Sequence, residues 1–194
     1  NNGGIIRGAD GAVRFQAEID PHALTAIAAE PRAQQSFHFA FSAADVTYLC
    51  HHSEGLRIER EAKDWDFPIV YIKESEIGEL TGIQQFSLGF PLPAQSDECA
   101  AVLNAKLGDK IHAFPNACSL DITPVGIGKD AGIRKLLSVM GWDGAEVYAI
   151  GDETNDLPML KAFDGYSITT ARTEIQTHAK EVFPSVGAML DHFR

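Results

Sequence analysis

Short apolar runs alternate with amphipathic stretches along the last third of the chain, and this alternation limits the fold more than any other feature. Val147-Tyr-Ala-Ile150 is almost continuously apolar, as expected for a strand that is covered on both faces. Periodicity predicts further strands at 119–123 and 166–168, and helices at 129–140, 155–162, 173–179 and 186–193. Strands and helices in this order predict βαβ units and a doubly wound, parallel α/β sheet.

The first part of the chain is richer in strands. Phe37, Phe39 and Phe41 alternate with small or polar residues, which predicts a strand whose phenylalanine face lies in a core. Asp20 has the position of an N-cap for a helix that follows it. Other strands are expected at 46–51, 69–73 and 84–90, a hairpin with an Asp-Gly turn within 1–15, and helices at 21–29 and 97–107. We place segment boundaries near residues 12 and 116.

Composition argues against several classes of function. Lysine and arginine number 16 against 27 aspartates and glutamates, and this net charge of −11 is unfavourable for binding nucleic acid. No apolar run approaches the ~18 residues of a membrane span. Cys50, Cys99 and Cys118 are scattered and are expected to be buried, reduced thiols. We therefore expect a cytoplasmic protein without nucleic-acid or membrane partners; the sequence does not indicate its oligomeric state.

The segment after the apolar run at 147–150 carries the strongest chemical signal. Gly151 and Asp152 come at the carboxyl end of the predicted strand, where open α/β sheets bind ligands. Asn155 and Asp156 follow at the start of a helix with Pro158 in its first turn. Hard oxygen ligands of this kind suit Mg²⁺, which needs only one or two carboxylates. Spacing alone leaves an alternative open, in which Asp152 is a turn residue and Asp156 an ordinary N-cap.

Two other clusters have simpler interpretations. His51 and His52 are adjacent, so on a strand they point to opposite faces, and we expect a strand-end or loop pair rather than metal ligands. Asp64-Trp65-Asp66 is the only Asp-x-Asp in the chain, and without a preceding apolar strand it is interpreted as a solvated loop. Trp65 could then touch substrate only if that loop closes over a site.

Gly-Asp-Glu-Thr-Asn-Asp-Leu-Pro-Met-Leu, residues 151–160, resembles the fourth motif of the haloacid dehalogenase-like (HAD) phosphatases, and in particular of their Cof-type branch. The stretch 119–133 is similar to the region in which that family places its third-motif lysine, and Lys129 is the matching residue. Asn2-Gly3 resembles a strand end that follows the second motif. The resemblance implies a Rossmann-like core, at 1–12 and 117–194, interrupted by an α/β cap at 13–116.

The resemblance also implies roles for single residues. Asp152 would bind Mg²⁺, and Asp156 would bind it through water or orient Asp152. Lys129 would be the catalytic cation that holds phosphoryl oxygens, a role that suits a compact ammonium group. Asn155 and Asn2 would help to bind the phosphorylated substrate.

The first motif of the family, Asp-x-Asp-x-Thr or a near variant, does not occur upstream of residue 119. The chain is therefore expected to begin within its core domain, with the nucleophilic aspartate in roughly 60–80 further residues that would form two βαβ crossovers.

The residues and the resemblance together leave three functions open. The first is a Mg²⁺-dependent phosphomonoesterase that hydrolyses a small metabolite such as a sugar phosphate through an aspartyl-phosphate intermediate. The others are a phosphotransferase or phosphomutase on the same scaffold, and a non-catalytic binding protein without the nucleophile.

Overall fold

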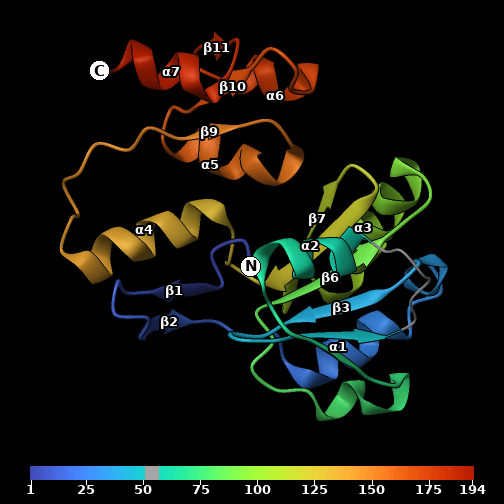
Figure 1. Cartoon of the computed structure of the whole chain (residues 1–194). Helices are drawn as coiled ribbons and strands as arrows, with labels where there is room; N and C mark the ends of the chain where they lie inside the picture. Colours follow the sequence, from blue (N-terminus) through green and yellow to red (C-terminus); the bar gives the residue numbers. More distant parts are fainter. Residues whose placement is uncertain (51–56) are drawn as a thin grey trace. The chain divides into compact units, whose positions relative to one another are not determined.

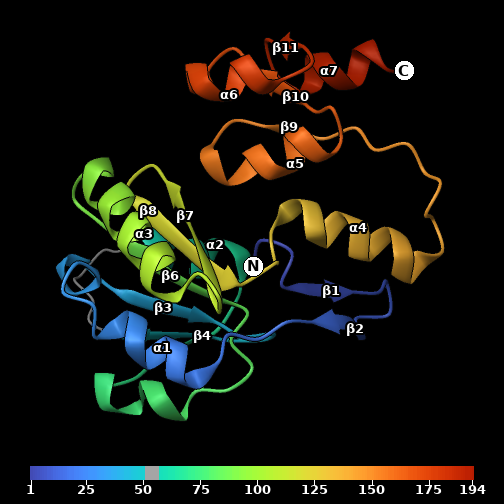
Figure 2. The ribbon, with the colours of Figure 1, turned by 180° about the vertical axis from the view of Figure 1, so that it is seen from behind.

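The computed structural model describes residues 1–50 and 57–194. They form two compact units, unit 1 (Asn1–Ile127) and unit 2 (Gly128–Arg194), whose elements are labelled in Figure 1 and seen from behind in Figure 2. No helix in this described part of the chain is long and apolar enough to cross a membrane. The predicted pair His51 and His52 lies outside the described residues, as does the side chain of Trp65.

Unit 1 is built on a six-stranded sheet in the order β5-β4-β3-β6-β8-β7. Only β4 and β5 pair in parallel; the other neighbours are antiparallel. The strands are β3 (Phe39–Ser42), β4 (Thr47–Cys50), β5 (Ile69–Tyr71), β6 (Gln85–Gly89), β7 (Ile111–Asn116) and β8 (Ser119–Pro124). The sheet is therefore mixed, with β6 and β8 in its interior.

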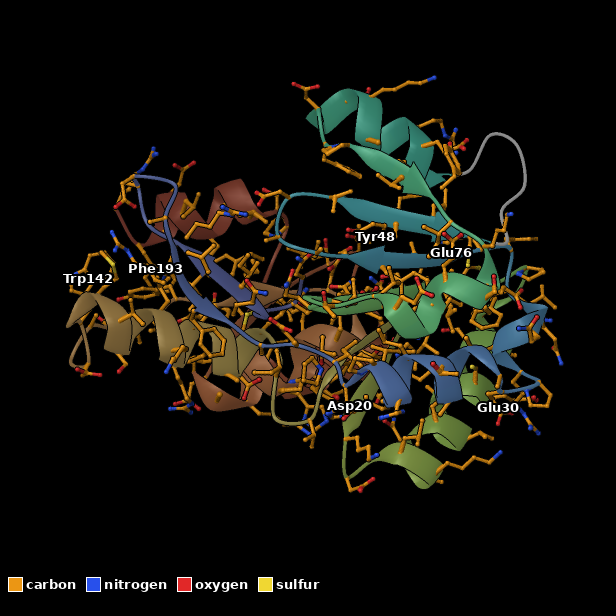
Figure 3. All side chains as sticks on the ribbon, turned by 90° about the horizontal axis from the view of Figure 1, so that it is seen from below. Asp20, Glu30, Tyr48, Glu76, Trp142 and Phe193 are labelled. Carbon is orange, nitrogen blue, oxygen red and sulfur yellow. The ribbon has the colours of Figure 1, made fainter. Side chains whose placement is uncertain are left out.

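Two helices, α1 (Pro21–Ala28) and α3 (Pro93–Leu107), cover one face of this sheet (Figure 3). Phe39 and Phe41 point into the core beneath them and are fully buried, as their period-2 pattern predicts. The predicted N-cap is confirmed, because Asp20 Oδ1 accepts hydrogen bonds from the amides of His22 and Ala23, at 2.7 and 3.3 Å. Two 3₁₀ helices, η1 (Ala33–Gln35) and η2 (Glu74–Glu79), complete this side.

The opposite face of the sheet is only partly covered. Helix α2 (Arg57–Trp65) lies on that side (Figure 3), where its Ile58 packs against the buried Ala40 and Leu49. On β6 and β8 the same face carries polar residues, among them Ser87 and Asp121, which lie opposite each other. Helices α1 and α3 therefore cover the apolar face of the sheet, and α2 covers the apolar part of the second face. These three helices do not cover the polar part of the second face, on β6 and β8.

A short hairpin precedes the sheet in the sequence. Strands β1 (Ile5–Arg7) and β2 (Val13–Gln16) pair antiparallel. Gly11 has φ 77°, and Asp10 Oδ1 accepts a hydrogen bond from the amide of Ala12 at 3.1 Å. This confirms the hairpin predicted from the Asp-Gly turn.

Unit 2 contains a three-stranded parallel sheet in the order β11-β10-β9, which confirms the predicted α/β class. Its strands are β9 (Ile150–Gly151), β10 (Tyr166–Ile168) and β11 (Val182–Phe183). Its helices are α4 (Lys129–Met140), the 3₁₀ helix η3 (Thr154–Asp156), α5 (Leu157–Ala162), α6 (Thr173–His178) and α7 (Val186–His192). Leu160 and Ile175 are fully buried in its core. Gly141, with φ 69°, ends α4 as predicted.

Several boundaries differ from the predictions because long-range pairing decides them. The strand predicted at 119–123 forms as β8, but it pairs antiparallel with β6 and β7 in the sheet of unit 1. The two compact units divide after Ile127, and the division into a core (1–12 and 117–194) and a cap (13–116) stays a prediction. The strand predicted at 147–150 is regular only at Ile150–Gly151, and Tyr148 before it is 44 % exposed. Helix α2, β7 and β11 were not predicted; α2 is strongly charged and β11 has only two residues.

Three predictions for single residues were wrong. Phe37 lies outside β3 and is 45 % exposed, so the buried stripe has two phenylalanines rather than three. Cys118 is exposed in the turn between β7 and β8, whereas Cys50 and Cys99 are buried free thiols as expected. Asp64 is solvent-exposed as predicted, but it lies within α2 rather than in a loop.

Candidate active site

The turn between β9 and α5 begins at a glycine that makes room for a carboxylate. A Cβ added to Gly151 would collide with Cβ of Asp156 and would lie 2.6 Å from its Cγ. The φ angle of Gly151 is not positive, so the residue is needed here for close approach rather than for a special turn conformation. The sequence Gly-Asp-x-x-Asn-Asp thus places the side chain of Asp156 directly against the backbone of the strand end.

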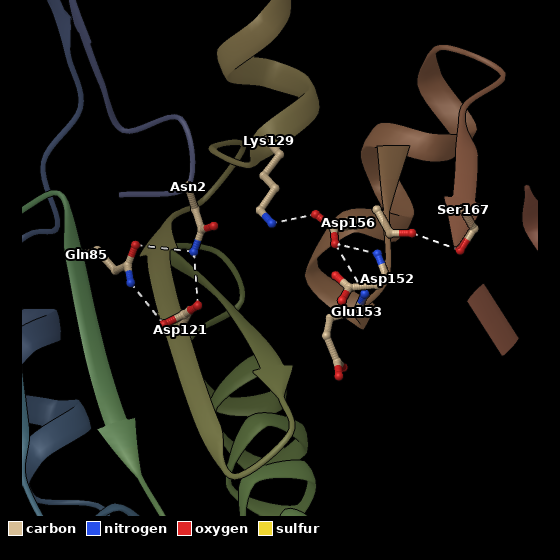
Figure 4. Close-up of polar contacts among 9 residues, drawn as sticks. Asn2, Gln85, Asp121, Lys129, Asp152, Glu153, Asp156 and Ser167 are labelled. Atoms are coloured by element: carbon tan, nitrogen blue, oxygen red, sulfur yellow. Dashed lines mark hydrogen bonds and ion pairs between the residues drawn. The ribbon is translucent and has the colours of Figure 1, made fainter. Parts of the chain in front are cut away.

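Asp156 makes more side-chain hydrogen bonds than any other described residue of this turn (Figure 4). Its Oδ1 lies 2.5 Å from Nζ of Lys129, and its Oδ2 accepts hydrogen bonds from the amides of Asp152 (3.0 Å) and Glu153 (3.2 Å). The residue is only 4 % exposed. A buried carboxylate is costly unless it is paired and hydrogen-bonded, and here both oxygens are engaged. Asp156 is therefore no ordinary N-cap, since its donors precede it rather than belong to α5.

Lys129 is the first residue of α4, and the side chain is about one third exposed, at 34 %. Its ammonium group neutralises Asp156 from one side and keeps part of its surface accessible to solvent. A lysine ammonium carries three donors, so the ion pair leaves donors available for a second anionic group. The structure thus brings Lys129 and Asp156, predicted from separate stretches of sequence, into direct contact.

Asp152 and Asn155 supply the unengaged oxygens of the turn. The Asp152 side chain is exposed, and no hydrogen bond or ion pair of its carboxylate occurs among the described residues. Asn155 is buried at 6 % exposure, and its Oδ1 has no hydrogen-bond partner in the described part of the chain. An unpaired buried oxygen requires a donor or a cation.

These two oxygens fit the ligand chemistry of Mg²⁺, which prefers carboxylate and amide oxygens and keeps several waters. Within residues 1–50 and 57–194 no group of three or more His, Cys, Asp or Glu side chains is arranged to hold a metal ion. A Mg²⁺ ion at this turn would therefore take most of its ligands from water, from substrate or from groups outside the described residues. Within the turn at 151–156, the Asp152 carboxylate is exposed and has no hydrogen bond or ion pair among the described residues, so it is the carboxylate of this turn that is free to bind such an ion.

Two supporting contacts were not predicted. Arg172 Nε lies 2.9 Å from Oε2 of Glu153, and this ion pair holds the side chain of Glu153, which lies between Asp152 and Asp156 in the sequence. Ser167 of β10 is fully buried and donates a hydrogen bond from Oγ to the carbonyl oxygen of Gly151 at 2.9 Å (Figure 4). Neither residue belongs to a recognisable pattern, since both act through strand and loop pairing that spacing does not reveal.

Asn2, the remaining predicted site residue, belongs to unit 1. Its Nδ2 donates to Oε1 of Gln85 at 3.2 Å and to Oδ2 of Asp121 at 3.3 Å (Figure 4). Asn2 adopts φ 44°, a conformation that asparagine tolerates better than most residues. In this arrangement its amide donors serve the sheet of unit 1, and its phosphate-binding role stays a prediction.

Comparison with solved structures agrees with the fold. The chain is 20% identical to a HAD subclass IIB sugar phosphatase, with a TM-score of 0.77 over 99% of this chain and 73% of that one. For a haloacid dehalogenase-like hydrolase from B. subtilis the identity is 16% and the TM-score 0.78, over 100% and 78% of the two chains. A HAD/COF-like hydrolase from Plasmodium vivax gives 20% identity and a TM-score of 0.73, over 94% of this chain and 65% of that one.

Sequence comparison gives the family. An uncharacterized protein from the pdhA 5' region of Geobacillus stearothermophilus is 37% identical over 59 residues, which are 30% of this chain and 62% of that protein. The chain thus spans less than two thirds of this relative and of the Plasmodium vivax protein. The model of the haloacid dehalogenase-like hydrolases matches residues 1–187. With the Gly-Asp-x-x-Asn-Asp turn and its lysine in contact, and with this match over nearly its whole length, the chain belongs to the haloacid dehalogenase-like hydrolase family.

Proposed function

We propose that this protein is a Mg²⁺-dependent phosphomonoesterase that acts on a small phosphorylated metabolite such as a sugar phosphate. The observation that carries the proposal is the arrangement of the turn after β9: an engaged, buried Asp156 holds Lys129, while Asp152 on the same turn keeps a free carboxylate. A cation and a free carboxylate at one strand end are the groups that phosphoryl transfer needs for charge neutralisation and metal binding.

Each residue has a defined task in this proposal. Lys129 binds the phosphoryl oxygens and stabilises the charge that develops on them. Asp156 orients Lys129 and the backbone of Asp152. Because both of its carboxylate oxygens are already engaged by these contacts, we assign it the orienting role rather than a metal-binding one. Asp152, with Oδ1 of Asn155 as a second oxygen, would hold Mg²⁺, which supplies Lewis-acid stabilisation of the phosphoryl group when bound. Asn2 is retained as a predicted substrate-binding residue.

The nucleophile of the reaction is expected outside the 194 residues, since they contain no Asp-x-Asp-x-Thr sequence. By resemblance to the family, an aspartate there attacks phosphorus, the alcohol leaves, and water hydrolyses the aspartyl-phosphate. Transfer of the same phosphoryl group to a sugar hydroxyl would make the protein a phosphotransferase or phosphomutase. A protein without the nucleophile would bind the phosphorylated ligand and leave it unchanged.

The experiment is a product analysis with the full-length protein. A panel of sugar monophosphates is incubated with Mg²⁺ or with excess EDTA, and inorganic phosphate and transferred sugar phosphates are both quantified. We expect stoichiometric inorganic phosphate from at least one sugar phosphate, dependent on Mg²⁺. Phosphorylated acceptor sugars in place of inorganic phosphate would identify a transferase, and binding without any turnover would contradict the enzymatic proposal.

A further inference from the structure

Two side chains of unit 2 hold the backbone on either side of Asp152. Ser167 of β10 contacts Gly151, the residue before it. Arg172, which directly precedes α6, contacts Glu153, the residue after it. The carboxylate of Asp152 makes no hydrogen bond or ion pair among the described residues, so these two side chains can influence it only through the backbone that carries it.

The hydroxyl group of Ser167 is directed at the end of strand β9. Ser167 is fully buried and pairs with Gly151, the last residue of β9, in the β9–β10 ladder. Its Oγ donates a hydrogen bond to the carbonyl oxygen of Gly151 at 2.9 Å (Figure 4). An alanine would fill nearly the same space without the cost of burying a hydroxyl group. What serine adds at this position is therefore a fixed carbonyl group directly before Asp152.

Strand β10 gives this hydroxyl group a rigid base. It is the central strand of the sheet, between β9 and β11. The amide of Ser167 donates to the carbonyl oxygen of Glu181 at 3.1 Å, and the amide of Tyr166 donates to that of Ala149 at 2.8 Å. Groups held by a strand that is bonded on both sides are positioned more precisely than groups on loops. The sheet therefore sets the position of the Gly151 carbonyl.

Arg172 holds the other side of Asp152 through Glu153. Its Nε lies 2.9 Å from Oε2 of Glu153, and both side chains are partly exposed. The amide of Glu153 donates to Oδ2 of Asp156 at 3.2 Å, so the residue after Asp152 is held by its side chain and by its backbone. A partly exposed ion pair is screened by water and salt, so we expect it to contribute less than the buried hydrogen bond of Ser167.

These contacts leave Asp152 with a fixed backbone and a free carboxylate. Its own amide donates to Oδ2 of Asp156 at 3.0 Å, which adds a third point of attachment to the two flanking ones. Mg²⁺ demands nearly ideal octahedral geometry, whereas Ca²⁺ accepts six to eight oxygen ligands in flexible arrangements. A carboxylate that is held in one direction therefore favours Mg²⁺ more than it favours Ca²⁺.

We propose that Ser167 and, to a smaller extent, Arg172 are positioning residues that orient the Asp152 carboxylate and raise the affinity of this turn for Mg²⁺ relative to Ca²⁺. The inference rests on the proposed function, because it takes Asp152 as the metal-binding carboxylate. Residues that orient a metal ligand typically change metal affinity by about 10- to 100-fold when they are replaced. A merely structural role would change the stability of unit 2 and leave the ratio of the two affinities as it is.

The test is calorimetric titration of the full-length protein with MgCl₂ and, separately, with CaCl₂, in the absence of substrate. Ser167→Ala should raise the Kd for Mg²⁺ by about 10-fold. The Kd for Ca²⁺ should rise by no more than about threefold, because Ca²⁺ tolerates irregular geometry. Arg172→Gln should raise the Kd for Mg²⁺ by about threefold, as the loss of a partly exposed ion pair gives. Unfolding curves in EDTA establish that each variant is folded.

The matched control is Thr177→Ala. It removes the same kind of hydrogen bond, from Oγ1 to the carbonyl oxygen of Glu174 at 2.7 Å, but within α6, and the affinity ratio should stay as in the unchanged protein. Equal weakening of both ions by Ser167→Ala, or no weakening of either, would overturn the inference. If Ser167→Ala does not fold, an unchanged ratio in Arg172→Gln would overturn it.

The two proposals fail in different ways. Mg²⁺ binding whose ratio to Ca²⁺ binding is the same in both variants as in the unchanged protein would overturn this inference and leave the proposed function standing. No binding of Mg²⁺ by the unchanged protein would overturn both.

Discussion

Lys129 Nζ lies 2.5 Å from Oδ1 of Asp156, so the first residue of α4 and the last residue of η3 form an ion pair across 27 positions of sequence. The same Asp156 binds the backbone amides of Asp152 and Glu153 through its other oxygen. The pair therefore links the lysine to the loop that carries the free carboxylate of Asp152. Among the described residues, Asp156 therefore contributes most to the positions of the charged groups at this turn.

Removal of the lysine should abolish most turnover. Lys129→Ala deletes the ammonium group that stabilises phosphoryl charge, and kcat should fall by at least ~10²-fold. Lys161→Ala is the control, because Lys161 is exposed on α5 and should have no effect. Steady-state kinetics on the full-length protein, below the unfolding temperature of each variant, measure the change. A loss of only a few-fold would mean that Lys129 is a surface charge.

A methyl group at the strand end should disturb Asp156. Gly151→Ala places a Cβ against the Asp156 side chain, so the turn must shift, and overpacking of this kind costs roughly 1–3 kcal/mol. Gly144→Ala is the matched control, because a Cβ there meets nothing within 4 Å, and it should stay within about 0.5 kcal/mol of the unchanged protein. Denaturant unfolding curves compare them; equal stabilities for both variants would contradict the packing found at Gly151.

The ion pair of Glu30 and Lys106 should make the stability of unit 1 depend on pH. The hydrogen bond from Lys106 Nζ, at 2.6 Å, holds the pKa of the buried Glu30 below its usual value of 4.5. A lowered pKa gives stability that is present above pH 4.5 and lost as the pH falls through the folded-state value. Lys106→Met should therefore cost roughly 1–3 kcal/mol at pH 7 and much less in acid. A pH-independent difference between the two unfolding curves would contradict this account.

The three thiols should react very differently. Burial raises the pKa of Cys50 and of Cys99 to about 12, whereas Cys118 is exposed. Since the thiolate is the reactive form, iodoacetamide at pH 8 should modify Cys118 alone in the native protein and all three cysteines in denaturant. Peptide mapping by mass spectrometry identifies the modified residues. Native labelling of Cys50 or Cys99 at the rate of Cys118 would contradict their burial.

Local signals in the sequence predicted local structure well. The N-cap of α1 at Asp20 and the end of α4 at Gly141 depend on neighbouring residues only, and both were confirmed. Strand β8 was also predicted, but its assignment to the parallel sheet was wrong, because the choice of partner is made by β6 and β7, which spacing does not encode. Helix α2 was missed because its composition is dominated by charged residues.

The candidate site was predictable in its residues and not in its contacts. Resemblance to the family singled out Lys129 and Asp156, but neither spacing nor resemblance indicated that both oxygens of Asp156 are used within the protein. The ion pair of Arg172 with Glu153 depends on where α6 begins after β10, and no local sequence pattern predicts it. Contacts between elements decide which carboxylate stays free, and they follow only from the folded chain.

The most direct test of the account is the Mg²⁺ dependence of sugar-phosphate hydrolysis in the full-length protein with Asp152→Asn. Asp143→Asn serves as the control, since Asp143 is likewise exposed in unit 2 but lies before β9. We expect Asp152→Asn to lose most Mg²⁺-stimulated turnover at every Mg²⁺ concentration tested, with an unchanged unfolding curve, and Asp143→Asn to retain it. Mg²⁺-stimulated turnover by Asp152→Asn equal to that of the unchanged protein would contradict the assignment of Asp152 as the metal-binding carboxylate.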